Sequence, residues 1–140
     1  LNAWVKKNVD DLAEALENGS EIVLLQNIAL DAPIVLNGSY TLDLNGYTLS
    51  QEKECSAHYS MIENHGNLTI TGNGTISFKD TGAGDPNFGW GSYTISNHAG
   101  TLVVENGTIE HIGEQVYKFF SCNCLFTGSI VQYLPTLFNQ

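Results

Sequence analysis

One phrase occurs three times along this chain, and it limits the fold more than any other feature. The copies are residues 41–50 (TLDLNGYTLS), 67–77 (NLTITGNGTIS) and 101–110 (TLVVENGTIE). Each copy has the pattern of a strand, a turn rich in Asn and Gly, and a second strand. A shorter phrase, residues 62–66 (IENHG) and again 95–100 (ISNHAG), precedes the last two copies. A chain that repeats its own turns in this way is predicted to stack equivalent strands.

The alignment of these copies predicts which side chains lie above one another. Leu42, Leu68 and Leu102 should form one apolar column, because neighbouring strands place equivalent residues about 4.8 Å apart. Asn64 and Asn97 should occupy equivalent corners, where a side-chain amide can bond the backbone of a neighbouring turn. The expected fold class is all-β: a short right-handed parallel β-helix, or solenoid.

Two other folds explain part of the pattern. Asn-Gly between alternating strands is also the signal of a β-hairpin, but a series of hairpins has no reason to repeat one phrase. A left-handed helix of six-residue repeats explains why Ile22, Ile28 and Ile34 lie six residues apart. A left-handed helix does not explain why the six-residue spacing ends after Leu42, or why the chain has insertions at residues 51–60 and 79–92. We expect these insertions to leave the stack as loops.

The N-terminal segment has a different periodicity. Residues 8–19 follow a helical pattern, with an acidic first turn and a glycine at the end. The apolar face of this helix is expected to carry Val9, Leu12, Ala13 and Leu16. We therefore predict an N-terminal helical cap over residues 1–20, followed by β-helix coils over residues 21–113 of the same single domain.

The C-terminal segment, residues 114–140, lacks the Asn-Gly turns, and it carries no charge from residue 119 onward. The end of a stack of strands is an open edge that needs a cover, so one interpretation is a terminal cap. The other is an assembly surface, because so apolar a segment can leave a patch that a partner buries. The assembly candidates are Phe119, Phe120, Phe126, Tyr133 and Leu137.

The charge composition excludes several classes of partner. Five Lys and Arg residues stand against fifteen Asp and Glu, so the formal net charge is −10. Without a basic stripe to meet phosphates, nucleic-acid binding is not expected. No apolar run is long enough to insert into a membrane.

The repeated phrases resemble those of a known family. Residues 21–25 (EIVLL), 40–46 (YTLDLNG) and 67–72 (NLTITG) look like the opening of pectate-lyase-like β-helix proteins of gut bacteria and their phages. With the short acidic helix, they are similar to bacterial surface adhesins and to phage head-fibre and capsid-decorating proteins. This resemblance covers about residues 9–113. It implies a trimer, located in a virion, outside the cell or at the cell surface.

Catalytic residues are not predicted. Enzymes of this fold need either two carboxylates on neighbouring coils or a cationic base beside a bound uronate. Asp43 aligns with Thr69 and Val103, so no carboxylate pair follows, and the chain has no arginine. Asp43 is instead expected to bond at a corner or to point outward.

Two histidines recur in register beside the corner asparagines. His65 and His98 could suggest a metal pair, but two imidazoles without a third ligand make a weak site, and a repeated turn position explains them equally well. Cys55, Cys122 and Cys124 have no metal-ligand spacing. We predict no metal ligands and no cofactor, apart from a weak case for calcium.

The longest insertion, residues 79–93, is the best candidate for ligand binding. Exposed aromatic side chains among glycines can stack on sugars or on protein partners. The candidates are Phe88, Trp90 and Tyr93, with Tyr59 from the neighbouring insertion. Asp80 and Asp85 could hold calcium. The alternative is a loop folded back against the stack.

These patterns, together with the resemblance, predict a non-catalytic structural or attachment protein, either a phage virion accessory protein (capsid-decorating or head-fibre) or a fragment of a bacterial surface adhesin. Its closest functional alternative is a carbohydrate-binding or carbohydrate-active domain, either a polysaccharide lyase or a glycoside hydrolase. The expected partners are further copies in a homotrimer, a capsid or cell-surface protein, or a glycan.

Overall fold

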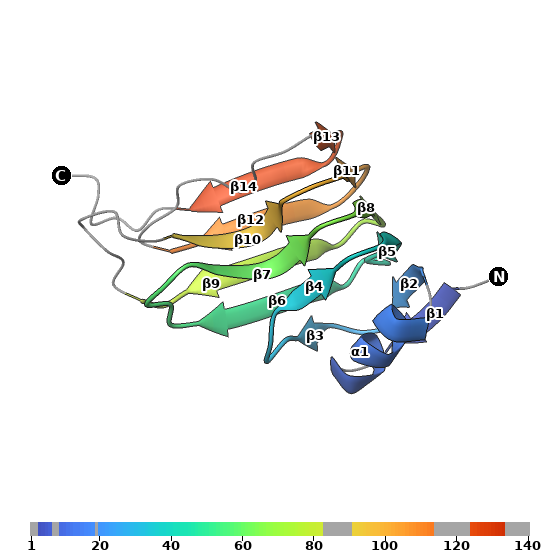
Figure 1. The fold of residues 1–140 in the computed structure, drawn as a ribbon, viewed down its shortest axis with the longest axis horizontal. Helices are drawn as coiled ribbons and strands as arrows, with labels where there is room; N and C mark the ends of the chain where they lie inside the picture. The colour runs from blue at the N-terminus through green and yellow to red at the C-terminus, as the bar shows by residue number, and fades with distance from the viewer. Residues whose placement is uncertain (1–2, 7–8, 19, 83–90, 114–123, 134–140) are drawn as a thin grey trace.

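The computed structural model describes residues 3–6, 9–18, 20–82, 91–113 and 124–133. Most of these residues lie in strands, and α1 is the only helix among them (Figure 1). In chain order the elements are β1 (Ala3–Lys6), α1 (Val9–Asn18), β2 (Glu21–Leu24), β3 (Ile28–Ala29), β4 (Ile34–Leu36), β5 (Ser39–Asp43), β6 (Thr48–Lys53), β7 (Tyr59–Asn64), β8 (Asn67–Thr71), β9 (Thr75–Asp80), β10 (Ser92–Asn97), β11 (Thr101–Val104), β12 (Thr108–Ile112), β13 (Cys124–Phe126) and β14 (Ser129–Tyr133).

The strands form three sheets, and every strand pair among them is parallel. Sheet A has the order β1-β2-β5-β8-β11-β13, sheet B has β3-β6-β9-β12-β14, and sheet C has β4-β7-β10. From β2 to β10 the chain visits A, B and C in turn and then returns to A. We call one such passage a circuit. Each circuit adds a strand to each sheet, and a crossover of this kind is what parallel neighbours require.

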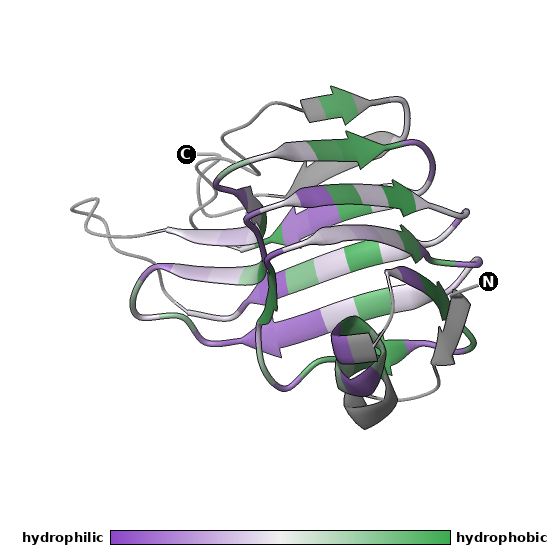
Figure 2. Cartoon of the chain, turned by 45° about the vertical axis from the view of Figure 1, so that its right-hand side comes forward, coloured by the Kyte–Doolittle hydropathy of each residue, from purple (hydrophilic) through white to green (hydrophobic). Residues whose placement is uncertain are grey.

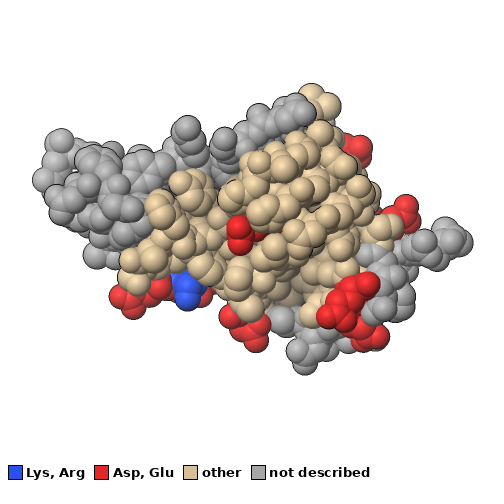
Figure 3. Space-filling model, in the orientation of Figure 1, with Lys and Arg blue, Asp and Glu red and all other residues tan. Residues whose placement is uncertain are grey.

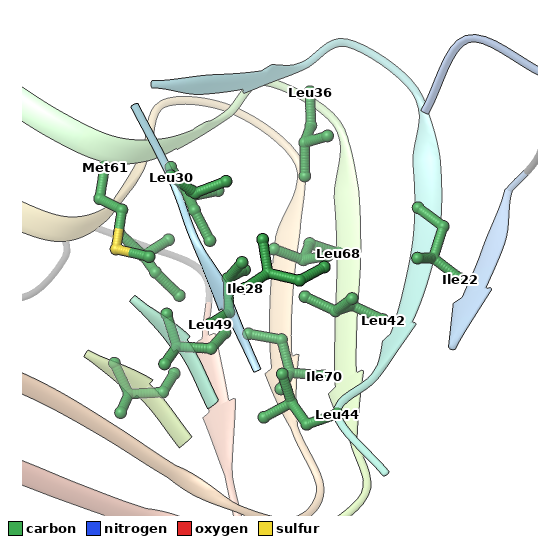
Figure 4. Packing of buried hydrophobic residues seen from close by; sticks show 14 of the residues in the cluster. Ile22, Ile28, Leu30, Leu36, Leu42, Leu44, Leu49, Met61, Leu68 and Ile70 are labelled. Atoms are coloured by element: carbon green, nitrogen blue, oxygen red, sulfur yellow. The ribbon is translucent and has the colours of Figure 1, made fainter. Parts of the chain in front are cut away.

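Apolar residues alternate with polar ones along the strands, and their inward faces form the core. Figure 2 shows the hydrophobic residues as bands that run across neighbouring strands. One column of Cα partners consists of Ile22, Leu42, Ile70 and Val104, all of them buried. Figure 4 shows Ile22, Leu42 and Ile70 with other buried side chains in the space between the sheets. Burying one Leu or Ile contributes about 1.5–3 kcal/mol, so this column is a main source of stability.

The register of the first circuits differs from the expected one. Leu68 pairs with Leu102, as the repeated phrase predicts. Leu42, however, pairs with Ile70, and Tyr40 is the residue that pairs with Leu68. The expected column of three leucines is therefore wrong by two residues. A shift of two keeps every inward residue inward, so the apolar alternation does not reveal it.

The N-terminal helix covers one end of the core, as expected. Leu12 and Ala15 are buried against the core, and the Tyr40 hydroxyl donates a hydrogen bond to the backbone oxygen of Leu16 over 3.0 Å. Ala13, which the helical pattern placed on the buried face, is exposed. Strand β1, which pairs with β2 at the edge of sheet A, was not foreseen within the helical cap.

The C-terminal part of the chain extends the sheets beyond Gly113, near which we expected the strands to stop. β13 pairs with β11, and β14 pairs with β12. The bend between them is made by Thr127 and Gly128, whose backbone amides both donate to the carbonyl of Val104, over 2.8 and 3.1 Å. This bend has no Asn-Gly pair, which is why the turn pattern did not predict it.

The two insertions are shorter than expected. β6 continues through Lys53 and β9 through Asp80, and β7 and β10 begin at Tyr59 and Ser92, so both ends of each expected loop lie in strands. Within the first expected loop, Gln51 is a buried strand residue, and its side-chain oxygen accepts a hydrogen bond from the Tyr59 hydroxyl over 2.7 Å.

Candidate functional site

Two groups of polar side chains stand out, and both are formed by neighbouring circuits. The first lies at the corner that follows β7 and β10. There Asn64 and Asn97 are Cα partners, and the Asn64 Nδ2 donates to the Asn97 Oδ1 over 2.6 Å and to the Thr101 carbonyl over 2.9 Å. The Asn64 Oδ1 accepts from the Gly66 amide over 3.2 Å. The expected shared corner is confirmed, and the Asn64 side chain is fully buried.

The corner fixes the two histidines that follow it. The His65 amide donates to the Leu36 carbonyl over 2.8 Å, and the His98 amide donates to the Asn64 carbonyl over 2.9 Å. Each histidine is thus anchored to the circuit before it. As a result the two imidazole rings stack on the outer surface, with 4.6 Å between ring centroids and 9° between ring planes.

A carboxylate completes this group. Glu63, the next-to-last residue of β7, directly precedes the corner asparagine, and its carboxylate reaches the same outer surface as the His65 ring. The Glu63 Oε1 lies 3.5 Å from the His65 Nε2 and 3.3 Å from the His98 Nε2. We call Glu63, His65 and His98 the Glu-His-His cluster; its possible ligand atoms all lie within 4.8 Å of one another.

The cluster lies on a surface that has little other charge. Glu63 is the only Asp, Glu, Lys or Arg among the residues of β4, β7 and β10. In Figure 3 most of the visible acidic side chains lie towards the edges of the view, away from the middle of the tan surface. Glu63 is therefore the one carboxylate in these three strands, and two imidazoles lie beside it.

The second group is buried. Asp80, at the end of β9, accepts hydrogen bonds at Oδ1 from the backbone amides of Cys55 and Gly82, over 3.1 and 2.9 Å. Its Oδ2 accepts from the Ser92 hydroxyl over 2.7 Å, and the Ser92 Oγ lies 3.1 Å from the His111 Nε2. Burial lowers the pKa of His111 from its ordinary value of 6.5.

This buried group contains Asp, Ser and His but does not have the arrangement of a nucleophilic triad. In a triad the serine donates its proton to the histidine, and the carboxylate orients the other ring nitrogen. Here the Ser92 hydroxyl has one proton and gives it to Asp80, so the His111 Nε2 must donate to the Ser92 oxygen. Ser92 and His111 are at most 1% exposed, which denies a substrate access. The group joins β9, β10 and β12.

Cys55 lies beside this group and is also buried. Burial, with a smaller contribution from the Asp80 carboxylate, raises the pKa of the Cys55 thiol to about 12. A thiol that stays protonated at neutral pH is a poor nucleophile and a poor metal ligand. Cys122 lies outside the described residues, and of Cys124 only the backbone position in β13 is described.

The predicted aromatic binding residues are only partly described. Phe88, Trp90 and Asp85 lie outside the described residues. Tyr93 of β10 is half-buried and pairs with Ser60, whereas Tyr59 pairs with Ser92, so the two side chains point to opposite faces of sheet C. The Tyr59 ring stacks on Phe78 with 5.6 Å between centroids. Binding by these aromatic side chains stays a prediction.

The remaining candidates are placed as follows. Asp43 is bonded at a corner, as expected, and its Oδ1 accepts from the Asn45 amide over 2.8 Å. Asp80, one of the two possible calcium ligands, is buried and bonded to three donors. Of the assembly candidates, Phe119, Phe120 and Leu137 lie outside the described residues, whereas Phe126 and Tyr133 are placed by backbone alone in β13 and β14.

Sequence reasoning missed Glu63 and the buried group for different reasons. Glu63 lies two residues before His65 in the sequence, so this short spacing could have indicated a third possible ligand beside the two histidines. Asp80, Ser92 and His111 come from three strands joined by long connections. Nothing in their spacing indicates that they meet.

Comparisons with known proteins identify no family. The one helix in the described part of the chain is too short and too polar to cross a membrane. No protein-family model matches the chain, and neither does any curated protein or solved structure.

Proposed function

We propose that this chain is a non-catalytic structural or attachment protein, and that its fold is a short right-handed parallel β-helix. One observation carries this proposal: the buried polar side chains bond neighbouring circuits to one another. Asn64 bonds the circuit of β10, and Asp80, Ser92 and His111 bond three strands. Side chains of the types that enzymes use are thus committed to holding the stack together.

The β-helix is supported by the order in which the chain visits its sheets. Each circuit adds one parallel strand to sheets A, B and C in the same sequence, and the inward column of Ile22, Leu42, Ile70 and Val104 continues from one circuit to the next. Crossovers between parallel strands are right-handed in about 98% of proteins, which favours the right-handed form. In this reading α1 covers the N-terminal end of the stack.

Attachment by self-association is supported by the other end. Among the described residues, no strand pairs with the outer edges of β13 and β14. An open sheet edge offers unpaired backbone groups to a second chain. Leu125, in β13, has 60% of its surface exposed. We propose a homotrimer joined near this end, as the resemblance to phage and surface proteins implies, with a capsid or a cell surface as its location.

Light scattering after size-exclusion chromatography tests the assembly. At micromolar concentration we expect a mass about three times the chain mass of 15.2 kDa. Leu125→Lys should shift the protein towards monomer. Val35→Lys is the matched control, because Val35 is also an exposed strand residue, at 49%, but lies on sheet C near the other end. A monomeric wild-type chain would overturn the self-association.

A glycan array and a panel of polysaccharides test the non-catalytic function. We expect no turnover and no sugar binding that depends on an aromatic side chain. Turnover of any polysaccharide, or glycan binding that Trp90→Ala abolishes, would replace this proposal with the carbohydrate-active or carbohydrate-binding alternative.

A further inference from the structure

We propose that the Glu-His-His cluster binds a divalent transition-metal ion such as Zn²⁺ on the outer surface of sheet C. The ligand atoms are the Oε1 of Glu63 and the Nε2 atoms of His65 and His98. Two observations on independent features support this site: the convergence of three donors from two circuits, and the isolation of the Glu63 carboxylate on a strand surface that has no other charge.

The donor spacing fits a small ion. Zinc lies about 2.0–2.2 Å from imidazole nitrogen and carboxylate oxygen in a tetrahedral site, so two of its ligand atoms are about 3.4 Å apart. The Glu63 Oε1 is 3.5 Å from one Nε2 and 3.3 Å from the other. These two separations therefore need almost no change when the ion binds.

The two rings need one adjustment. They are nearly parallel, at 9°, and an ion must lie close to the plane of each imidazole that binds it. At least one ring must therefore turn about its Cβ–Cγ bond. The side chains of His65 and His98 are 37% and 49% exposed, which leaves room for this rotation. The backbone beneath them is held by the buried Asn64, so only side chains need to move.

The Ser96 hydroxyl is a further neighbour of one of the proposed donors, the His98 Nε2. The Ser96 Oγ lies 3.0 Å from the His98 Nε2, and Ser96 is the Cα partner of Glu63. A hydroxyl hydrogen bond in water contributes little and is given up easily. Removing this hydroxyl should therefore leave metal affinity unchanged or raise it, which distinguishes chelation at Nε2 from a purely structural role of the corner.

The donor types decide the class of ion. Two imidazoles suit Zn²⁺, Ni²⁺, Cu²⁺ and Co²⁺, whereas Ca²⁺ and Mg²⁺ require mainly oxygen ligands. Three protein donors leave a fourth position of a tetrahedral ion for solvent, as the exposure of the cluster allows. The formal charge of −10 adds a general attraction for cations, but a site that depended on charge alone would bind calcium as well.

Titration calorimetry with ZnCl₂ and the visible absorption of Co²⁺ test the site. The experiment uses the Cys122→Ser/Cys124→Ser background, because thiols bind both ions. We expect one ion per chain, a Co²⁺ spectrum of tetrahedral type, and no heat with CaCl₂. Glu63→Gln, His65→Gln and His98→Gln should each lower the Zn²⁺ affinity about tenfold or more.

Two variants serve as controls. His58→Gln changes another exposed histidine, away from the cluster, and should leave affinity unchanged. Ser96→Ala should bind at least as tightly as the parent. Circular dichroism establishes that each variant is folded. The proposal is overturned if the wild-type chain binds no Zn²⁺, or if it binds Zn²⁺ but the Cys122→Ser/Cys124→Ser background does not. It is also overturned if Ser96→Ala weakens binding as much as His98→Gln does.

Discussion

Asn64 and Asn97 are joined by a hydrogen bond of 2.6 Å inside the protein, between the Nδ2 of one and the Oδ1 of the other. In the preceding strand of sheet C, β4, the same column holds Leu36, the Cα partner of Asn64. One column thus changes from an apolar to a polar side chain between successive strands. The change coincides with a corner whose backbone groups need partners: Gly66 N and Thr101 O are both bonded to the Asn64 amide.

We expect Asn64→Leu to lower the free energy of unfolding by about 1–3 kcal/mol, although leucine occupies the same position one strand earlier. The substitution leaves the Asn97 Oδ1, the Thr101 carbonyl and the Gly66 amide without the bonds that Asn64 provides. Urea unfolding followed by circular dichroism measures the change. Asn73→Ser, at an exposed turn, is the control and should change the free energy by less than about 0.5 kcal/mol. Equal stability of Asn64→Leu and wild type would mean that the amide contributes nothing.

The same corner brings glycine backbones into contact. A Cβ on Gly66 would overlap the carbonyl of Gly38 in the preceding circuit, and backbone atoms cannot rotate away. We expect Gly66→Ala to cost about 1–3 kcal/mol in urea unfolding. Gly38→Ala is a matched control, because its Cβ would meet only the Tyr40 ring at an ordinary 3.5 Å. If both variants lost the same stability, the clash would not be the cause.

The features that the sequence predicted are those that depend on local patterns. Helical periodicity identified α1, and the repeated Asn identified the corner shared by Asn64 and Asn97. The register failed where one pattern fits two alignments. The second copy of the phrase has two glycines, Gly72 and Gly74, and aligning Gly46 with the first shifts the strands by two residues. In the observed pairing, Leu42 of β5 lies 28 residues before its partner Ile70, whereas Thr48 of β6 lies 27 residues before its partner Thr75, so the turns of the two copies differ in length by one residue.

The candidate sites depend on contacts between side chains of different strands, and the sequence carries less information about these contacts. His65 and His98 were found because they repeat, but the distances to Glu63 come from side-chain positions that the repeat does not fix. Asp80 and His111 meet because β9 and β12 are neighbours in sheet B. Their distance in space depends on how many residues the connections leave out of the sheets, which a sequence pattern does not define.

The buried His111 should make stability depend on pH. Burial lowers its pKa from 6.5, so below about pH 6.5 the unfolded chain takes up a proton that the folded chain does not. Neutral His111 therefore contributes to the free energy of unfolding above pH 6.5, and this contribution is lost as the pH falls towards the lowered pKa. The ring contacts Ser92 and Phe78, and the Asp80 carboxylate is bonded to Ser92.

Urea unfolding of wild type and His111→Gln at pH 7.5, 6.5 and 5.5 measures this effect. Gln51 occupies the same column two strands earlier, so glutamine is a reasonable substitute. We expect wild type to be the more stable at pH 7.5. The difference in free energy of unfolding between wild type and His111→Gln should decrease below pH 6.5, by at most about 1.4 kcal/mol per pH unit, which is the limit for one proton. His65 and His98 are present in both proteins and cancel. A difference that stays constant with pH would show that His111 titrates alike in both states.

Cys55 should be protected from thiol reagents in the folded protein. Its pKa is raised from 9.0 to about 12, which leaves about 10³-fold less thiolate at pH 8 than an unperturbed thiol has, and the side chain is only 4% exposed. In the Cys122→Ser/Cys124→Ser background, Cys55 is the single cysteine. We expect labelling by a disulfide reagent at pH 8 to be at least 10³-fold slower in the native protein than in urea.

The matched control adds Cys55→Ser and Ala57→Cys to this background, because Ala57 is exposed two residues away. That control should react at nearly the same rate in both conditions. Native Cys55 reacting as fast as the control would mean that residues 53–57 open readily and that the bond from the Cys55 amide to Asp80 does not hold this corner.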